Sequence, residues 1–201
     1  MLAVLLVAVI LPWLIVGEAF EHWAQGVAIA LSHRPWLLMA LIAGLLALDP
    51  VLPVPSSIVA VAAGSALGTR IGALAIWIGL MAGVLFGCWL GRHAGRGLAA
   101  RWLDPAALAG FDARLRPIGP LVLLVSRPIP VVAETVTILA GAGRLPLSLV
   151  LGTTAPANAA LAFVWAGLGA ASDGSNIAPA VVGGLIIPAI GLAVWPLVRR
   201  R

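Results

Sequence analysis

The chain has 201 residues, of which 62% are hydrophobic and 9% are charged, and its net charge is +5. Several apolar runs approach the ~20 residues needed to cross a bilayer, which excludes a soluble protein and predicts one compact membrane domain. The positive charge does not predict nucleic-acid binding, because all twelve basic residues are arginines and most lie in predicted loops or at the C-terminus, where they set membrane topology.

Residues 1–35 predict a first helix followed by an interfacial segment. Residues 2–16 form a continuous apolar run, which a signal peptide would also show. We favour a retained helix, because no Lys or Arg precedes the run and the Gly-Glu-Ala sequence after it is a poor cleavage pattern. The rest of this region mixes charged, aromatic and apolar residues, as interfacial segments do.

Residues 36–90 predict a first hairpin followed by a full span. An apolar helix over 36–48 is expected to end at Asp49, because the sequence DPVLPVPSS cannot continue a helix. A helix of this length rises about 20 Å, which reaches the bilayer middle without crossing it. Residues 58–67 are apolar again, so we predict a re-entrant hairpin that returns to its own side, followed by a span over 71–90.

The predicted span carries a glycine at every fourth position, a spacing that places all of them on one helix face. Such a face forms a groove that another helix can approach closely. The pattern leaves open whether the partner helix belongs to the same chain or to a second copy in a homodimer. The residues are Gly79, Gly83, Gly87, Gly91 and Gly95.

Residues 117–170 predict a second hairpin followed by a span. Ten apolar residues, about 15 Å of helix, lead to an Arg-Pro-Ile-Pro break that begins at Arg127. The apolar residues from Thr135 to Gly143 form the return arm. A span over 147–170 follows, starting after a proline that suits a helix start.

The distribution of arginines predicts how these elements are oriented in the membrane. The 91–116 loop has five Arg and two Asp, and the last span with its basic tail, residues 177–201, ends in three Arg. The positive-inside rule makes both regions cytoplasmic. Counting crossings then places the N- and C-termini in the cytoplasm and makes the two hairpins enter from opposite faces.

A short internal similarity supports this topology. Pro53-Val-Pro55 precedes Ala63-Gly64, as Pro128-Ile-Pro130 precedes Ala140-Gly141. Opposite entry and similar sequence indicate an inverted repeat, whose broken helices meet around a site at the bilayer midplane. The predicted fold is therefore an all-α polytopic membrane protein with two opposed re-entrant helical hairpins and about four transmembrane helices.

The two breaks bring polar groups to membrane depth. A central arginine costs roughly 2.5–3.5 kcal/mol in a lipid environment, so Arg127 needs a partner or a function. The return helices are expected to begin near Pro55 and Pro130, with free N–H groups that attract anions. Together with Ser56 and Ser57, these groups predict an anion-binding site suited to phosphate.

Asp49 and Glu134 are the acidic counterparts, and we expect them to exchange a proton or coupling ion during transport. Two simpler interpretations stay open: Asp49 caps a helix, or Arg127 and Glu134 form a static ion pair that fixes the second hairpin. No hydrolase triad, metal-ligand spacing or phosphate-binding loop is visible in the sequence, so we expect no enzymatic activity, cofactor or metal. The single cysteine, Cys88, excludes an intramolecular disulfide.

In order and spacing, these segments resemble the DedA family, the bacterial branch of the VTT-domain (SNARE-associated) membrane proteins. The resemblance implies opposed re-entrant hairpins and movement of lipids across the bilayer, coupled in bacterial members to the proton motive force. It also implies a phosphate-binding role for Arg127, although Ala133 stands where many members have a second arginine. The resemblance covers residues 36–170 and rests on LPVPSSIVAVAAGSALG (52–68), GxxxGxxLGRxxGR (83–96), FDARL (111–115), SRPIPVVAE (126–134) and LAGAGRL (139–145).

The expected function is a flippase or scramblase for an anionic lipid, either a polyprenyl phosphate or a phospholipid. The expected location is the bacterial inner membrane, and the expected partners are the lipid and protons. A carrier of small anions and a membrane scaffold that transports nothing are the two alternatives.

Overall fold

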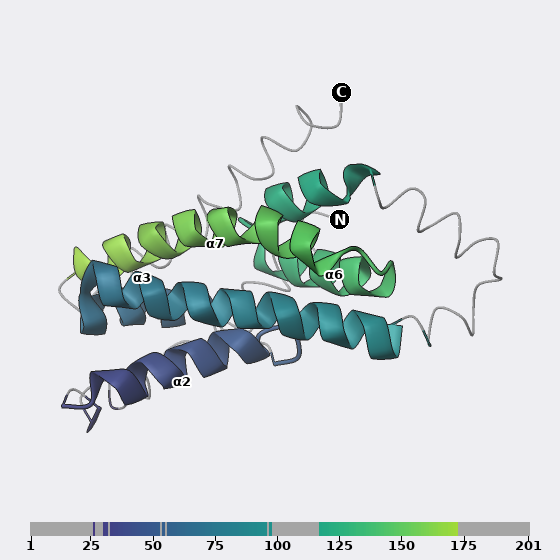
Figure 1. Cartoon of the computed structure of the whole chain (residues 1–201). Helices are drawn as coiled ribbons and strands as arrows, with labels where there is room; N and C mark the ends of the chain where they lie inside the picture. The colour runs from purple at the N-terminus through teal and green to yellow at the C-terminus, as the bar shows by residue number, and fades with distance from the viewer. Residues whose placement is uncertain are drawn as a thin grey trace, which may run out of the picture.

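The computed structural model describes residues 26, 30–31, 33–52, 54, 56–95, 97 and 117–172, and each regular element among them is a helix. The predicted N-terminal helix, most of the 91–116 loop and the last span with its basic tail lie outside the described residues. The elements, in chain order, are α2 (Pro35–Leu48), α3 (Ser56–Leu90), η1 (Gly91–Gly95), a helix over Pro117–Ser126, α6 (Pro130–Ala142) and α7 (Leu147–Ala170) (Figure 1).

A kink at Gly68 divides α3 into a return helix, residues 56–67, and a span, residues 69–90. Gly68 has φ 73° and ψ 171°, in the left-handed half of the backbone map that glycine enters without a Cβ penalty. The turn is tight, because a Cβ atom added to Gly72 would lie 2.8 Å from the Ala63 carbonyl oxygen. The chain thus turns at Gly68, between the two apolar segments predicted over 58–67 and 71–90.

The first half of the α3 glycine groove receives α2. A Cβ atom at Gly79 would lie 2.8 Å from the Leu46 Cβ, and one at Gly83 would lie 3.0 Å from the Leu46 carbonyl oxygen. Gly79 also faces Ala43, so residue numbers rise together along both helices and α2 runs parallel to the span. Helix α2 therefore ends beside Gly83, before the end of the span, as its short length predicts.

The second half of the same groove receives α6. Gly87 faces the Thr137 side chain, and Gly91 faces the backbone of Ile138. Helix α6 also runs parallel to the span, but it starts near the middle and continues alongside η1. The predicted glycine groove is confirmed, and the helices that fill it belong to the same chain.

The second hairpin is broken at the predicted place. The helix over Pro117–Ser126 ends before Arg127, and α6 begins at Pro130 after Ile129, whose backbone is extended at φ −115° and ψ 99°. Proline suits this first turn because its missing N–H would have no helical partner there.

Helix α7 has the predicted bounds and packs along α3 in the opposite direction (Figure 1). The Trp77 indole Nε1 donates a hydrogen bond to the Ala155 carbonyl at 3.0 Å. Near one end Val150 packs in a cluster with Cys88, and near the other end Ala166 packs in a cluster with Ala73. These contacts make α7 antiparallel to the α3 span.

The two return helices pack against the two spans through matching contacts. A Cβ atom at Gly64 would overlap the Ala166 backbone, and one at Gly141 would overlap the Cys88 backbone in the same way. Residues that make these contacts in the first half of the chain correspond to residues in the second half at a constant sequence offset, to within one residue. Val61 corresponds to Ile138, Gly64 to Gly141, Cys88 to Ala166, and Gly91 to Gly169.

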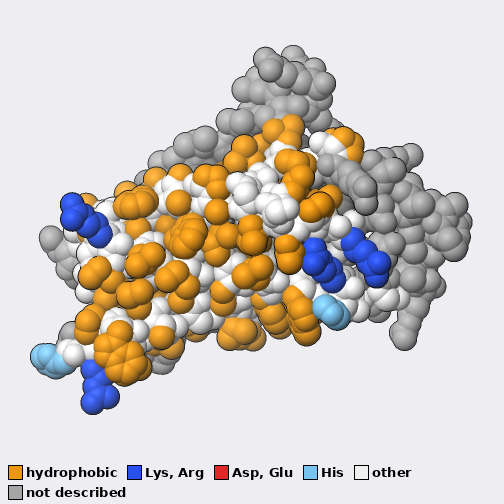
Figure 2. Space-filling view, in the orientation of Figure 1, with side chains coloured by type: hydrophobic (Ala, Val, Ile, Leu, Met, Phe, Trp, Pro, Cys, Tyr) orange, Lys and Arg blue, Asp and Glu red, His pale blue; other side chains and the backbone are white. Residues whose placement is uncertain are grey.

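The outer surface of the described body is apolar over most of its length. Figure 2 shows hydrophobic side chains across the face in view, with basic side chains gathered at the two ends. Large side chains such as Ile78, Leu85 and Phe163 are exposed on this surface. Two helices, Ser56–Gly95 and Leu147–Ala170, are long and apolar enough to cross a membrane.

The glycine contacts predict a specific pattern of stability. We expect Gly141→Ala to destabilise the protein by at least ~2 kcal/mol, because the added Cβ would overlap the Cys88 backbone. Gly152→Ala in α7 is the control, since nothing lies within 4 Å of its added Cβ and helix propensity favours alanine by ~0.5–1 kcal/mol. Thermal unfolding in detergent measures both variants, and equal midpoints would contradict the close packing.

Candidate functional site

The two breaks meet near the middle of the rod that α3 and η1 form from residue 69 to Gly95. Helix α2 ends beside Gly83, and the first turns of α6 reach Gly87, one helical turn further along. At 1.5 Å per residue this rod extends about 39 Å, and Gly83 and Gly87 lie about 21 Å and 27 Å along it. Polar groups carried by the breaks are therefore held near mid-height of the bundle.

Asp49 and Glu134 come together at this meeting point. Asp49 follows α2 directly, and its carboxyl group lies within hydrogen-bonding range of the Glu134 carboxyl group on α6. It also interacts with the Ser56 side chain and the Val54 backbone. An ionised carboxylate has no donor, so two neighbouring carboxyl groups can hydrogen-bond to each other only if one is protonated. The chain thus brings together, between α2 and α6, two groups that are able to take up a proton.

Arg127 lies at the same break and is held by oxygens of the second hairpin. Its Nε donates to the Leu123 carbonyl at 3.2 Å, and its Nη2 donates to the Ala133 carbonyl at 2.9 Å and to the Thr137 hydroxyl at 2.8 Å. Glu134 is close enough to attract the guanidinium electrostatically. Yet every hydrogen bond that Arg127 donates within the described residues goes to a neutral oxygen, so its charge is not neutralised in a direct ion pair.

The other predicted site residues differ in how close the structure places them to the acidic pair. Ser56 opens α3 beside Asp49, whereas Ser57 is half-buried in the same turn and makes no side-chain hydrogen bond to the acidic pair. Pro130 opens α6 as expected. Pro55 lies outside the described residues. The structure thus brings Asp49, Ser56, Arg127 and Glu134 to one region.

Thr137 is a site residue that the sequence analysis missed. Its side chain is fully buried, accepts from Arg127, and donates to the Ala133 carbonyl at 2.6 Å. Its backbone carbonyl accepts from the Cys88 thiol at 3.5 Å, which links α6 to α3. A signal was present, because Thr137 follows Glu134 by three positions and therefore lies on the same helix face.

The described residues of this region include no set of side chains that could bind a metal ion. Within residues 33–95 and 117–172, as far as they are described, no group of three or more His, Cys, Asp or Glu side chains is arranged to hold a metal ion. The site is built instead from two carboxyl groups, one guanidinium, hydroxyl groups and the open end of a helix.

Comparison with known proteins gives one match. A family model for the VTT domain matches residues 54–171. The match begins just before the first return helix and ends just after α7, so it covers both return helices and both spans but not Asp49. No curated protein and no solved structure matches the chain.

The arrangement around Arg127 predicts how much Thr137 contributes to stability. We expect Thr137→Val to destabilise the protein by about 1–3 kcal/mol, because it removes an acceptor from a partly buried guanidinium. Thr154→Val is the matched control, since Thr154 is equally buried but its hydroxyl donates only to the Val150 carbonyl of its own helix. The measurement is thermal unfolding of each purified variant, and an equal loss in both would show that the contact with Arg127 adds nothing.

Proposed function

Because the chain belongs to the DedA family of VTT-domain membrane proteins, we propose that it moves an anionic lipid across the bacterial inner membrane, by flipping or scrambling, in a process coupled to protons. The observation that carries the proposal is the pairing of Asp49 with Glu134 where two broken helices meet inside an apolar bundle. A polar site at this depth is costly in a protein that only needs to be embedded in lipid.

The packing of the return helices supports the proposed inverted repeat. The Gly68 turn reverses the chain, so the first return helix runs antiparallel to the α3 span and parallel to α7. Helix α6 runs parallel to the α3 span. The two return helices therefore run in opposite directions, as they would if two half-membrane hairpins entered from opposite faces of the bilayer.

Arg127 and the start of α6 are the groups we assign to the phosphate of the substrate. The Nη1 nitrogen of Arg127 has no hydrogen-bond partner within the described residues, so two N–H donors are available to an anion. The N-terminal N–H groups of α6 begin three residues later and favour negative charge. Ala133 stands where many family members have a second arginine, which makes this a site with a single fixed cation.

The acidic pair explains how protons would be coupled to an anionic substrate. When both carboxyl groups are ionised, they repel a phosphate that approaches Arg127. When the pair takes up a proton, one negative charge is removed and the phosphate binds more easily. Proton binding and substrate binding then favour each other, and a proton gradient gives the movement a direction.

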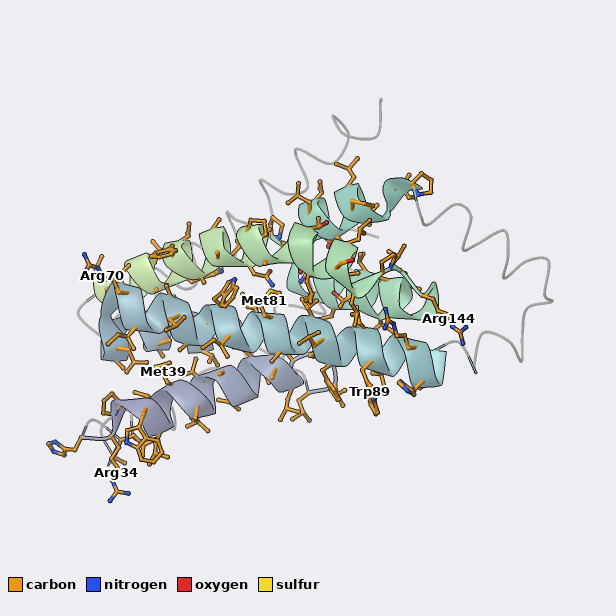
Figure 3. All side chains as sticks on the ribbon, viewed as in Figure 1. Arg34, Met39, Arg70, Met81, Trp89 and Arg144 are labelled. Carbon is orange, nitrogen blue, oxygen red and sulfur yellow. The ribbon has the colours of Figure 1, made fainter. Side chains whose placement is uncertain are left out.

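A liposome assay with labelled anionic lipid tests the site. We expect Arg127→Ala to reduce lipid movement at least 10-fold, because it removes the one fixed cation that the described residues place near the acidic pair. Arg70→Ala is the control, since Arg70 is exposed at one end of the bundle (Figure 3). Equal rates for wild type and Arg127→Ala would contradict the assignment of Arg127.

The same assay separates the alternative functions. Asp49→Asn and Glu134→Gln should lose the dependence of transport on an imposed pH gradient, because each leaves a single carboxyl group in place of a proton-sharing pair. Uptake of small anions without lipid movement would favour the carrier, and no movement of either under any gradient would favour the scaffold.

The proposed orientation predicts accessibility of single cysteines placed in a Cys88→Ser background. Gly174→Cys should react with a membrane-impermeant reagent added outside intact cells, because the positive-inside rule puts this loop on the outer side. Gly110→Cys should react only after the membrane is opened. The reverse pattern of labelling would invert the topology.

A further inference from the structure

A second cationic site lies at the end of the bundle where η1 meets the turn between α6 and α7. Arg92, on η1, donates a hydrogen bond from Nη2 to the Leu145 carbonyl at 2.7 Å. This bond holds the guanidinium of Arg92 next to Arg144, the residue that precedes Leu145. Figures 2 and 3 show basic side chains gathered at this end, around the labelled Arg144.

Arg92 has more donors than the protein uses. Its Nε is buried and has no hydrogen-bond partner, the only such buried side-chain nitrogen or oxygen in the described part of the chain. Its Nη1 donates to nothing in that part either, so the bond to Leu145 is the one hydrogen bond that Arg92 makes within the described residues. A buried unpaired donor costs free energy and calls for a partner that completes it.

Arg144 occupies a backbone conformation that is unusual for its residue type. Its φ is 50°, the one positive φ at a residue other than glycine in the described residues, and its N–H bonds to the Gly141 carbonyl at 3.0 Å. Glycine or asparagine is the usual choice for such a position after a helix. The side chain is exposed, so burial does not explain why an arginine stands here.

Among the described residues, neither guanidinium group has an acidic partner. Asp49 and Glu134 are the acidic residues in the described part of the chain, and both lie at mid-height, in the first site. The C-terminal carbonyls of α6 offset some of the charge. What remains is two positive charges at the same end of the bundle, which together attract an anion more strongly than either does alone.

The surroundings of this pair are those of a lipid headgroup. Trp89, two residues before η1, is exposed, and its ring centroid lies 5.0 Å from that of the His93 ring. Exposed tryptophan at the end of an apolar span is typical of the interface between acyl chains and headgroups. A ligand here therefore meets two cations on one side and an apolar, lipid-facing surface on the other.

We propose that Arg92 and Arg144 bind the phosphate of an anionic phospholipid headgroup at this end of the bundle. Arginine suits this role because its planar N–H groups match phosphate oxygens. The lipid tails lie along the exposed apolar surface next to Trp89. This site is separate from the one around Arg127, and it exists whether or not the protein transports lipid.

Native mass spectrometry of the detergent-solubilised full chain tests the proposal. The probes are a short-chain phosphatidylglycerol, a phosphatidylcholine of equal chain length, and inorganic phosphate. The test variant is Arg92→Gln/Arg144→Gln. The matched control is Arg34→Gln/Arg70→Gln, which removes the same charge from the other end of the bundle, where the two arginines stand apart (Figure 3).

We expect the wild type to bind phosphatidylglycerol more tightly than phosphatidylcholine. The test variant should lose roughly 10- to 30-fold in affinity for phosphatidylglycerol, and the control less than 2-fold. Arg144→Gln alone keeps the Arg92 bond to Leu145, and it should still weaken binding several-fold in a protein whose thermal unfolding is unchanged.

Three results would overturn the proposal. Equal losses of phosphatidylglycerol affinity in the two double variants would show that binding depends only on net charge. Equal binding of the two lipids would remove the role of the headgroup charge. Displacement of the lipid by millimolar inorganic phosphate would assign the site to free phosphate.

Discussion

Close approach of helix backbones along the glycine groove of α3 is the constraint on which the rest of the structure depends. Between helices in lipid there is little hydrophobic driving force, so association relies on packing at short range. Glycines on α3 let α2 approach over the first half of the span and α6 over the second half. Where those two helices stop along the groove decides where the breaks lie, and thus which charged residues meet.

The break in the second hairpin also explains how a guanidinium is tolerated at this depth. The N–H of Arg127 bonds to the Leu124 carbonyl, which leaves the Leu123 carbonyl outside the regular helical pattern. That oxygen accepts from the side chains of Arg127 and Ser126 instead. The unpaired carbonyl at a helix end and the unpaired charge therefore satisfy one another, as polar groups away from water must. Arg127 thus closes its own helix and ties it to the first turns of α6.

Sequence patterns predicted the elements of this fold better than the contacts between them. Proline positions and apolar run lengths were sufficient to place both breaks and the bounds of α7, because each is a local property of the chain. Glycine spacing predicted a groove but not its occupants, since a periodicity identifies a face and not what covers it. The pairing of Asp49 with Glu134 and the bond from Arg92 to Leu145 join residues far apart in the sequence. No local pattern encodes such pairs, and Thr137 was missed because an isolated threonine in an apolar helix has many ordinary roles.

Helices α2 and α6 lie one after the other along a single groove, and this limits how the protein can move. Both helices pack on α3 through close glycine contacts, and the carboxyl pair lies where they meet, so sliding of either helix along the groove would change those contacts. Rotation of α2 or α6 about the long axis of α3 meets less resistance, because glycine has no side chain that would obstruct the partner helix. A change in access to the carboxyl pair would then be a rotation of one hairpin about the long axis of α3, and not a translation of that hairpin across the membrane.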